Sequence, residues 1–351
     1  METLLQDRLE KFKKVINEAT EEIAIILSHL DPDSIACAKV FAEICKHFEK
    51  KLRIYYAGGL HLPQNKIVWN KFGLAEDFIK LEKFTPDKQN RVSVVLLDSS
   101  SIKDPRLQNL ELRPIIVVDH HLNADNLEET EAEWYQLSVC GAAITLIIQI
   151  YLSLGFDFST NDDLATLAVL GILTDTGMMK LVSKYATDLD REAFTYLMKF
   201  ANDAKIREIF SSVKDKKYLT FLNKATTNTE TREDTIITNI GFIDADDEVY
   251  AALLAEELCS IQGISTVVVW ALDDKNKLYI KVRTVDDKIE MQQFIAKRFG
   301  EGTGGGRTGA GAAIIEPPPQ FYIPSTAAGR ELYMKFVKQL IVDALFKNPS
   351  E

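Results

Sequence analysis

The feature of this sequence that most constrains its fold is a series of short, wholly apolar runs that each stop at Asp or His. The run Ile23–Leu27 is followed by His29, Asp31 and Asp33. The run Val92–Leu97 is followed by Asp98, and the run Ile115–Val118 is followed by Asp119, His120 and His121. Apolar runs without polar alternation, separated by helical patterns, are typical of parallel strands covered on both faces. The sequence therefore predicts an α/β fold with helices on both faces of a parallel sheet in its N-terminal half.

The length of 351 residues exceeds what one ordinary hydrophobic core needs and predicts two domains. We expect a parallel-sheet catalytic domain over residues 1–200, a charged helical connector over 201–234, and a smaller α/β domain over 235–351. In this last domain, strands are expected near 235–242, 265–272 and 278–284, and helices near 248–258 and 288–299. A glycine-rich segment, 300–311, and a final helix, 327–346, follow.

Composition and charge limit the class of protein. A hydrophobic fraction of 46% with 26% charged residues is typical of a soluble globular chain. The net charge of −11 argues against a general nucleic-acid coat protein, and no long duplex partner is expected. The N-terminal segment has the pattern of a charged amphipathic helix, and no apolar run reaches membrane-spanning length, so we expect a cytoplasmic protein without a membrane partner. The four cysteines form no Cys-x-x-Cys pair, which predicts reduced thiols and no zinc site.

The Asp and His clusters are candidates for a metal site. Because the carboxyl ends of parallel strands open on one side of a sheet, residues that follow different strands are expected to meet at one rim. Asp175, in the segment 171–177, is a further candidate for this rim. Imidazoles and carboxylates without thiolates suit Mn²⁺ above all, with Mg²⁺ as the alternative, and one or two ions are expected. Two adjacent ions can activate a water and neutralise phosphate oxygens.

Each candidate also has a simpler explanation. A lone Asp behind a strand is usually a helix cap or a turn residue, and His29 alone would be a solvated loop residue. Capping does not explain why three of the five histidines directly follow apolar strands. A metal-free sugar or nucleotide binder stays open as an alternative, although it has no use for so many carboxylates facing an anion.

The segment Val117-Val118-Asp119-His120-His121 resembles the signature of the DHH phosphoesterases. This superfamily includes RecJ exonucleases, nanoRNase/pAp phosphatases, cyclic-dinucleotide phosphodiesterases and exopolyphosphatase relatives. Four further motifs resemble the family pattern in the expected order: Ser28-His29 with Pro32-Asp33, Leu96–Ser100 followed by Arg106, Thr174–Gly177, and Gly304–Arg307. The last is similar to the glycine-rich motif of the DHH-associated C-terminal domain, so the resemblance covers nearly the whole chain.

The resemblance implies a role for each matched residue. His29 and Asp33 would hold the first metal, Asp98 would bridge two ions, and His120 and Asp175 would contribute to the second. His121 would contact the scissile phosphate, so His121 and Asp98 are the expected catalytic residues.

The second domain would bind the rest of the substrate. The expected contacts are Arg283 and a loop formed by Gly304, Gly305, Gly306 and Arg307. Backbone N–H groups in a glycine loop can approach an anion closely. The simpler alternative is a flexible turn between strands.

Two positions depart from the family pattern. The first family motif reads His-x-x-x-Asp-x-Asp, and Ile35 stands at the last position, so a carboxylate expected on the second metal is missing. Asp31 lies nearby on the other side of Asp33, and its capacity to substitute stays open. Arg307 stands where the family usually has His after the glycines; its charged fork preserves phosphate affinity.

The leading prediction is a metal-dependent phosphoesterase of the nanoRNase/pAp phosphatase type, which hydrolyses short oligonucleotides or nucleoside phosphates by metal-activated water. A nucleotide- or phosphate-binding protein with catalysis weakened by Ile35 is one alternative. An exopolyphosphatase-like enzyme or a cyclic-dinucleotide phosphodiesterase is another. Processive digestion of long DNA is less favoured, because no basic, aromatic track for single strands is evident. Since relatives are often dimeric, a homodimer is also an open expectation.

Overall fold

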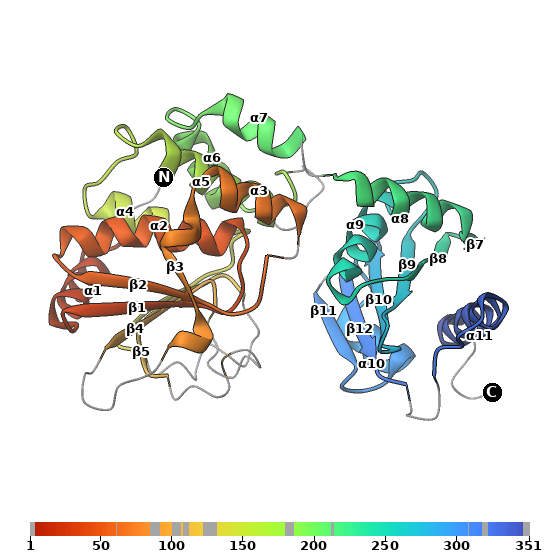
Figure 1. Cartoon of the computed structure of the whole chain (residues 1–351). Helices are drawn as coiled ribbons and strands as arrows, with labels where there is room; N and C mark the ends of the chain where they lie inside the picture. Colours follow the sequence, from red (N-terminus) through yellow and green to blue (C-terminus); the bar gives the residue numbers. More distant parts are fainter. Residues whose placement is uncertain are drawn as a thin grey trace. The chain divides into compact units, whose positions relative to one another are not determined.

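The computed structural model describes residues 4–60, 62–84, 92–99, 107, 112–121, 132–179, 186–211, 214–307, 309–317 and 322–346. The chain folds into two compact units, Met1–Val213 and Lys214–Glu351 (Figure 1). The segment 201–234, which we expected to connect two domains, contributes helix α7 (Asp203–Ser211) to the first unit. It contributes helix α8 (Lys216–Thr227) and strand β7 (Glu230–Arg232) to the second.

Unit 1 is built on a six-stranded, fully parallel sheet in the order β3-β2-β1-β4-β5-β6. The strands are β1 (Glu22–Leu27), β2 (Lys51–Tyr56), β3 (Phe78–Lys80), β4 (Ser93–Leu97), β5 (Pro114–Asp119) and β6 (Trp134–Leu137). The predicted parallel sheet is therefore confirmed. The strand order changes direction between β1 and β4, which is where α/β proteins of this kind have their crevice.

The helices of unit 1 are α1 (Gln6–Glu18), α2 (Pro32–His47), α3 (Pro63–Lys71), α4 (Ala143–Ser153), α5 (Asp162–Asp175), α6 (Asp188–Leu197) and α7. The larger core lies where α1, α2, α4 and α5 pack on one face of the sheet. On the other face, Ile26, Leu96 and Val117 pack with Leu81 and Phe84, at and next to the 3₁₀ helix η2 (Leu81–Lys83). These apolar runs form central strands because both of their faces are buried.

Unit 2 contains a mixed six-stranded sheet in the order β11-β12-β10-β9-β8-β7. Its further strands are β8 (Thr235–Phe242), β9 (Thr266–Leu272), β10 (Leu278–Thr284), β11 (Gly304–Arg307) and β12 (Ala310–Ile315), and its further helices are α9 (Glu248–Leu258), α10 (Met291–Phe299) and α11 (Ala327–Phe346). Trp270 of β9 packs in a core with Ile295 of α10 and Ile341 of α11. No helix in the described ranges of either unit combines the length and apolar character needed to cross a bilayer.

The glycine-rich segment of unit 2 corrects one expectation. Gly304–Arg307 is not a loop: it is the edge strand β11, paired antiparallel with β12. A Cβ atom at Gly305 would collide with the side chain of Gln292, and one at Gly306 would lie 2.5 Å from Cγ of Met291. The missing side chains therefore allow β11 to lie directly against helix α10.

Candidate metal centre

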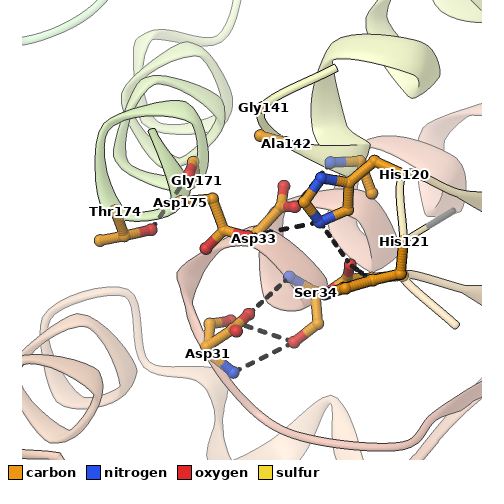
Figure 2. A network of polar contacts seen from close by, with 12 residues as sticks. Asp31, Asp33, Ser34, His120, His121, Gly141, Ala142, Gly171, Thr174 and Asp175 are labelled. Atoms are coloured by element: carbon orange, nitrogen blue, oxygen red, sulfur yellow. Dashed lines mark hydrogen bonds and ion pairs between the residues drawn. The ribbon is translucent and has the colours of Figure 1, made fainter. Parts of the chain in front are cut away.

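The Asp and His residues predicted to form a rim do meet at the carboxyl edge of the unit 1 sheet. His29 follows β1, Asp98 follows β4, and His120 and His121 follow β5, and these three strands are neighbours. Asp175 is the last residue of α5. Figure 2 shows Asp31, Asp33, His120, His121 and Asp175 gathered in one place.

One group of potential ligand atoms belongs to His29, Asp31 and Asp98. Nε2 of His29 lies 3.0 Å from Oδ2 of Asp98 and 3.1 Å from Oδ2 of Asp31. Asp31 is also the N-cap of α2, where its Oδ1 accepts a hydrogen bond of 2.9 Å from the Ser34 N–H. Its two oxygens thus serve the helix and the cluster at the same time.

A second group belongs to Asp33, His120 and Asp175. Nε2 of His120 lies 3.4 Å from Oδ2 of Asp175 and 3.4 Å from Oδ1 of Asp98. Asp98 therefore approaches His29 with one carboxylate oxygen and His120 with the other, as expected for a residue between two cation positions.

Asp33 is fully buried, and the start of helix α4 holds its carboxylate. Oδ2 accepts from the Ala143 N–H at 2.6 Å, and Oδ1 accepts from the Ile144 N–H at 2.9 Å. Gly171 of α5 permits this arrangement, because a Cβ there would lie 3.1 Å from Cα of Asp33. Three helices thus converge on one carboxylate.

The geometry corrects the interpretation of the first motif. It groups His29 with Asp31, whereas Asp33 belongs with His120 and Asp175. Ile35 is fully buried in the hydrophobic core of unit 1. Ile35 thus lies apart from the cluster, in which Asp31 and Asp33 are the two carboxylates of this loop.

Asp119 has a role that the sequence did not assign to it. Its Oδ1 lies 2.8 Å from Nδ1 of His121 and also accepts hydrogen bonds from the N–H groups of His120 and His121, at 2.8 and 3.2 Å. The ring of His121 is held through Nδ1, and its side chain is 45% exposed. His121 can therefore offer Nε2 to a ligand. The motif contained the signal, since Asp119 immediately precedes both histidines.

Asp98 has an uncommon backbone conformation. Its φ of 55° lies in the left-handed region, where residues other than glycine are rare. Its N–H donates to the Val118 carbonyl at 2.9 Å, which ties the end of β4 to β5. Such backbone strain concentrates at functional sites.

The carboxylates of the cluster have shifted pKa values. Burial raises the pKa of Asp33 well above its usual range, and Asp98 and Asp175 raise it further. Burial also raises the pKa of Asp175. Burial alone would raise the pKa of Asp98, but His29 and His120 outweigh it and lower this pKa. So many acids in one buried space favour a positive species among them.

The imidazoles of His29 and His120 supply this charge when they are protonated. Burial alone would lower the pKa of His120, but Asp175 and Asp98 outweigh it and raise this pKa to about 12. Asp31 and Asp98 likewise raise the pKa of His29 well above its usual range, against the effect of burial.

The donor set fits a divalent metal. Both carboxylate oxygens of Asp98 and Nε2 of His120 are buried, and within the described residues their imidazole–carboxylate contacts do not have the geometry of hydrogen bonds. Buried polar atoms without partners are costly, and a cation would satisfy all three. Carboxylate and imidazole ligands without thiolates are compatible with Mn²⁺ or Mg²⁺.

The residues expected to bind the rest of the substrate belong to unit 2. Arg283 lies on β10, where its Nε donates to Glu256 at 3.1 Å. The strand register places Ala310 of β12 opposite Arg283 on one side and opposite Arg307 on the other. Arg106, a further residue of the family pattern, lies outside the described residues.

Comparison with known proteins agrees with this site. Residues 23–172 match the model of the DHH family, N-terminal domain. Unit 1 thus contains a region that matches the DHH family, N-terminal domain, in agreement with the resemblance of its motifs. The matched region includes every cluster residue except Asp175, which lies just beyond it. A sequence search of curated proteins gives no match.

A crystal structure of an exopolyphosphatase-related protein from Bacteroides fragilis shares the fold. The alignment has a TM-score of 0.71 at 14% identity and covers 98% of this chain and 99% of the other. A pGpG-specific phosphodiesterase from Vibrio cholerae aligns over 92% and 99% of the two chains, at 10% identity and a TM-score of 0.41. Magnesium-bound RecJ from Thermus thermophilus aligns over 97% and 57%, at 12% identity and a TM-score of 0.44.

Proposed function

We propose that this chain is a metal-dependent phosphoesterase that hydrolyses short oligonucleotides or nucleoside phosphates, as nanoRNase/pAp phosphatases do. The observation that carries the proposal is the cluster around Asp98, in which buried carboxylate and imidazole atoms lack hydrogen-bond partners. The match of residues 23–172 to the DHH family supports the reaction class. The choice of substrate within that class is our inference.

The chain's own residues have distinct tasks in this proposal. His29, Asp31 and Asp98 would hold one cation, and Asp33, Asp98, His120 and Asp175 the other. Two divalent ions, when bound, neutralise phosphate oxygens and lower the pKa of a water. Asp119 orients His121, which would contact the scissile phosphate on its Nε2 side.

Unit 2 would recognise the remainder of the substrate, as a DHH-associated C-terminal domain does. Arg283 supplies a charged fork for a terminal phosphate or a base edge. The strand β11, from Gly304 to Arg307, lies at the edge of its sheet, and its Gly306 N–H donates to Oε1 of Gln292 at 3.0 Å. We assign the contact on this side of the substrate to these two elements.

Turnover with defined substrates tests the proposal. The purified chain with Mn²⁺ would be mixed with a labelled dinucleotide, pAp, a cyclic dinucleotide and polyphosphate, and products would be separated by ion exchange. We expect cleavage of the dinucleotide or pAp, and none by Asp98→Asn. No turnover of any substrate by a chain that has bound its metal would refute the phosphoesterase.

Polyphosphate is included among the test substrates for a separate reason. The structure with the TM-score of 0.71 is named an exopolyphosphatase-related protein, so a linear phosphate chain is the second candidate substrate. Preference for polyphosphate over every nucleotide would replace the nucleotide assignment and leave the metal centre unchanged. The alternative of a binding protein whose catalysis is weakened by Ile35 is less favoured, because this residue lies in the core.

A further inference from the structure

Asp190 on helix α6 is a fully buried carboxylate outside the cluster of potential ligands. Four hydrogen bonds reach it. The N–H and hydroxyl of Thr187 donate to Oδ2 at 2.8 and 2.7 Å, the Gly141 N–H donates to Oδ2 at 2.7 Å, and the Thr145 hydroxyl donates to Oδ1 at 2.7 Å. All the donors are protein groups, and they come from two separate parts of the chain.

The bonds from Thr187 are local, because Thr187 and Asp190 form the capping box at the start of α6. The N-terminal cap of α6 needs only these local bonds. The bonds from Gly141 and Thr145 reach instead to the loop before α4 and to its first turn. Asp190 therefore fastens the start of α4 to α6.

The segment that Asp190 fastens supports both imidazole and carboxylate ligands. The carbonyl oxygen of Cys140 lies 3.1 Å from Nδ1 of His120. The N–H groups of Ala143 and Ile144 hold the carboxylate of Asp33. Three residues of the segment 140–144 thus contact two members of the second ligand group, and Asp190 binds the N–H of Gly141, which directly follows Cys140.

We propose that Asp190 is a positioning residue for the metal centre. It fixes the 140–144 segment, in which the Cys140 carbonyl orients the ring of His120 and the start of α4 orients the carboxylate of Asp33. This inference rests on the proposed function and adds to it a residue that no motif contains. A ligand histidine depends on the hydrogen bond at its other ring nitrogen, and loss of such outer contacts typically costs about 10- to 100-fold in metal affinity or activity.

Three variants separate positioning from general stability. Asp190→Ala removes all four acceptor contacts. Asp190→Asn can keep the N–H donors on its amide oxygen while its NH₂ group donates to the Thr145 hydroxyl, so it is the conservative rescue. Gln149→Ala is the matched control: it removes a buried 2.9 Å hydrogen bond with Gln136 and lies farther along α4.

The first readout is Mn²⁺ affinity by calorimetry on the folded, full-length chain. We expect Asp190→Ala to weaken binding by about 10- to 100-fold, Asp190→Asn to restore most of the loss, and Gln149→Ala to bind as the unaltered chain does. Wild-type affinity in folded Asp190→Ala would overturn the proposal, and so would equal losses in Asp190→Ala and Gln149→Ala.

The second readout does not depend on metal or catalysis. In the metal-free chain, a ring proton on Nδ1 of His120 that is bonded to the Cys140 carbonyl exchanges slowly, and ¹⁵N-histidine spectra would detect it. We expect this protected signal in the unaltered chain and in Asp190→Asn, and its loss in Asp190→Ala. If the unaltered chain binds no Mn²⁺, the proposed function fails, and this signal still decides the positioning role. A protected signal that persists in Asp190→Ala would overturn it. If Asp190→Ala does not fold, Thr145→Val removes one donor and must show a smaller change in the same direction.

Discussion

Asp98 is the residue that both parts of the metal centre share. Its Oδ2 lies 3.0 Å from His29 and its Oδ1 lies 3.4 Å from His120. In the described part of the chain, neither oxygen makes a contact with the geometry of a hydrogen bond. Its backbone, with φ of 55°, is in the left-handed region directly after the end of β4.

Asp98→Asn should abolish measurable turnover. It should also weaken Mn²⁺ binding by about 10- to 100-fold or more, since loss of a contact to a metal ligand alone has an effect of this size. The amide keeps the shape but loses the charge and one acceptor. Calorimetry and a hydrolysis assay check this, with Asp188→Asn as the control, because Asp188 is 97% exposed on α6. Activity in Asp98→Asn equal to that of the control would contradict the assigned role.

Ile35→Asp separates the two interpretations of the first motif. If position 35 faced the metal, a carboxylate there would raise activity. Because Ile35 is fully buried in the core, we expect a loss of several kcal/mol in the free energy of unfolding and no gain in turnover. Urea denaturation measures the first quantity, and Ile35→Val should cost only about 1 kcal/mol. A stable Ile35→Asp chain with higher activity would instead mean that position 35 faces the metal, as the family pattern implies.

Helices α2, α4 and α5 make the site at the scale of elements. The start of α2 supplies Asp31 and Asp33, the start of α4 donates two N–H groups to Asp33, and the end of α5 supplies Asp175. Helix N-termini favour carboxylates, so α2 and α4 stabilise charge where the cluster needs it. Close packing of α5 on α2 brings Asp175 to the same place.

Gly171→Ala tests this packing. The new Cβ would lie 3.1 Å from Cα of Asp33 and 3.2 Å from Cγ2 of Ile144. Alanine favours a helix by about 1 kcal/mol over glycine, but forced contacts in a packed core typically cost about 1–3 kcal/mol. We expect a lower melting temperature and weaker Mn²⁺ binding. A higher melting temperature with unchanged binding would mean that the helices separate freely.

The elements that the sequence predicted well are those with a simple physical signal. Apolar runs gave β1, β4 and β5 to within about two residues, and the helical pattern gave the bounds of α11. The short strands β3 and β6 were missed, because three or four residues with exposed positions carry no such signal. Gly304–Arg307 was taken for a loop, since its fit against α10 depends on residues remote in sequence.

The candidate site was predictable in membership but less so in grouping. His29, Asp33, Asp98, His120 and Asp175 all meet, because strand ends converge at one edge. The grouping of Asp31 with His29 depends on how the chain turns into α2, which motif spacing does not describe. Asp190 carried no signal at all, because its contacts join separate parts of the chain.

At the scale of the whole molecule, the cluster should make the stability of the metal-free chain depend on pH. The pKa of His120 is raised from 6.5 to about 12 in the folded chain. A raised pKa contributes stability that is complete below the unfolded value and is lost as pH rises through the folded value. The same sign holds for His29, whose pKa is also raised.

We therefore expect the melting temperature of the metal-free chain to fall between pH 7 and pH 9, within the window from 6.5 to about 12. Bound Mn²⁺ should remove much of this fall, because the metal replaces the protons. Scanning calorimetry with EDTA and with Mn²⁺ measures both. A metal-free chain that is more stable at pH 9 than at pH 7 would contradict the charge balance described for the cluster.

The most direct test of the metal centre is a calorimetric titration of the metal-free, full-length chain with Mn²⁺ at pH 6 and pH 8, in buffers of different ionisation enthalpy. Metal and protons compete for His29, His120 and the carboxylates, so binding should release protons and be tighter at pH 8. Asp31→Asn should weaken it, whereas Ile35→Val should not. Absence of Mn²⁺ binding, or binding without proton release that Asp31→Asn leaves unchanged, would contradict the assignment of this cluster as a metal centre.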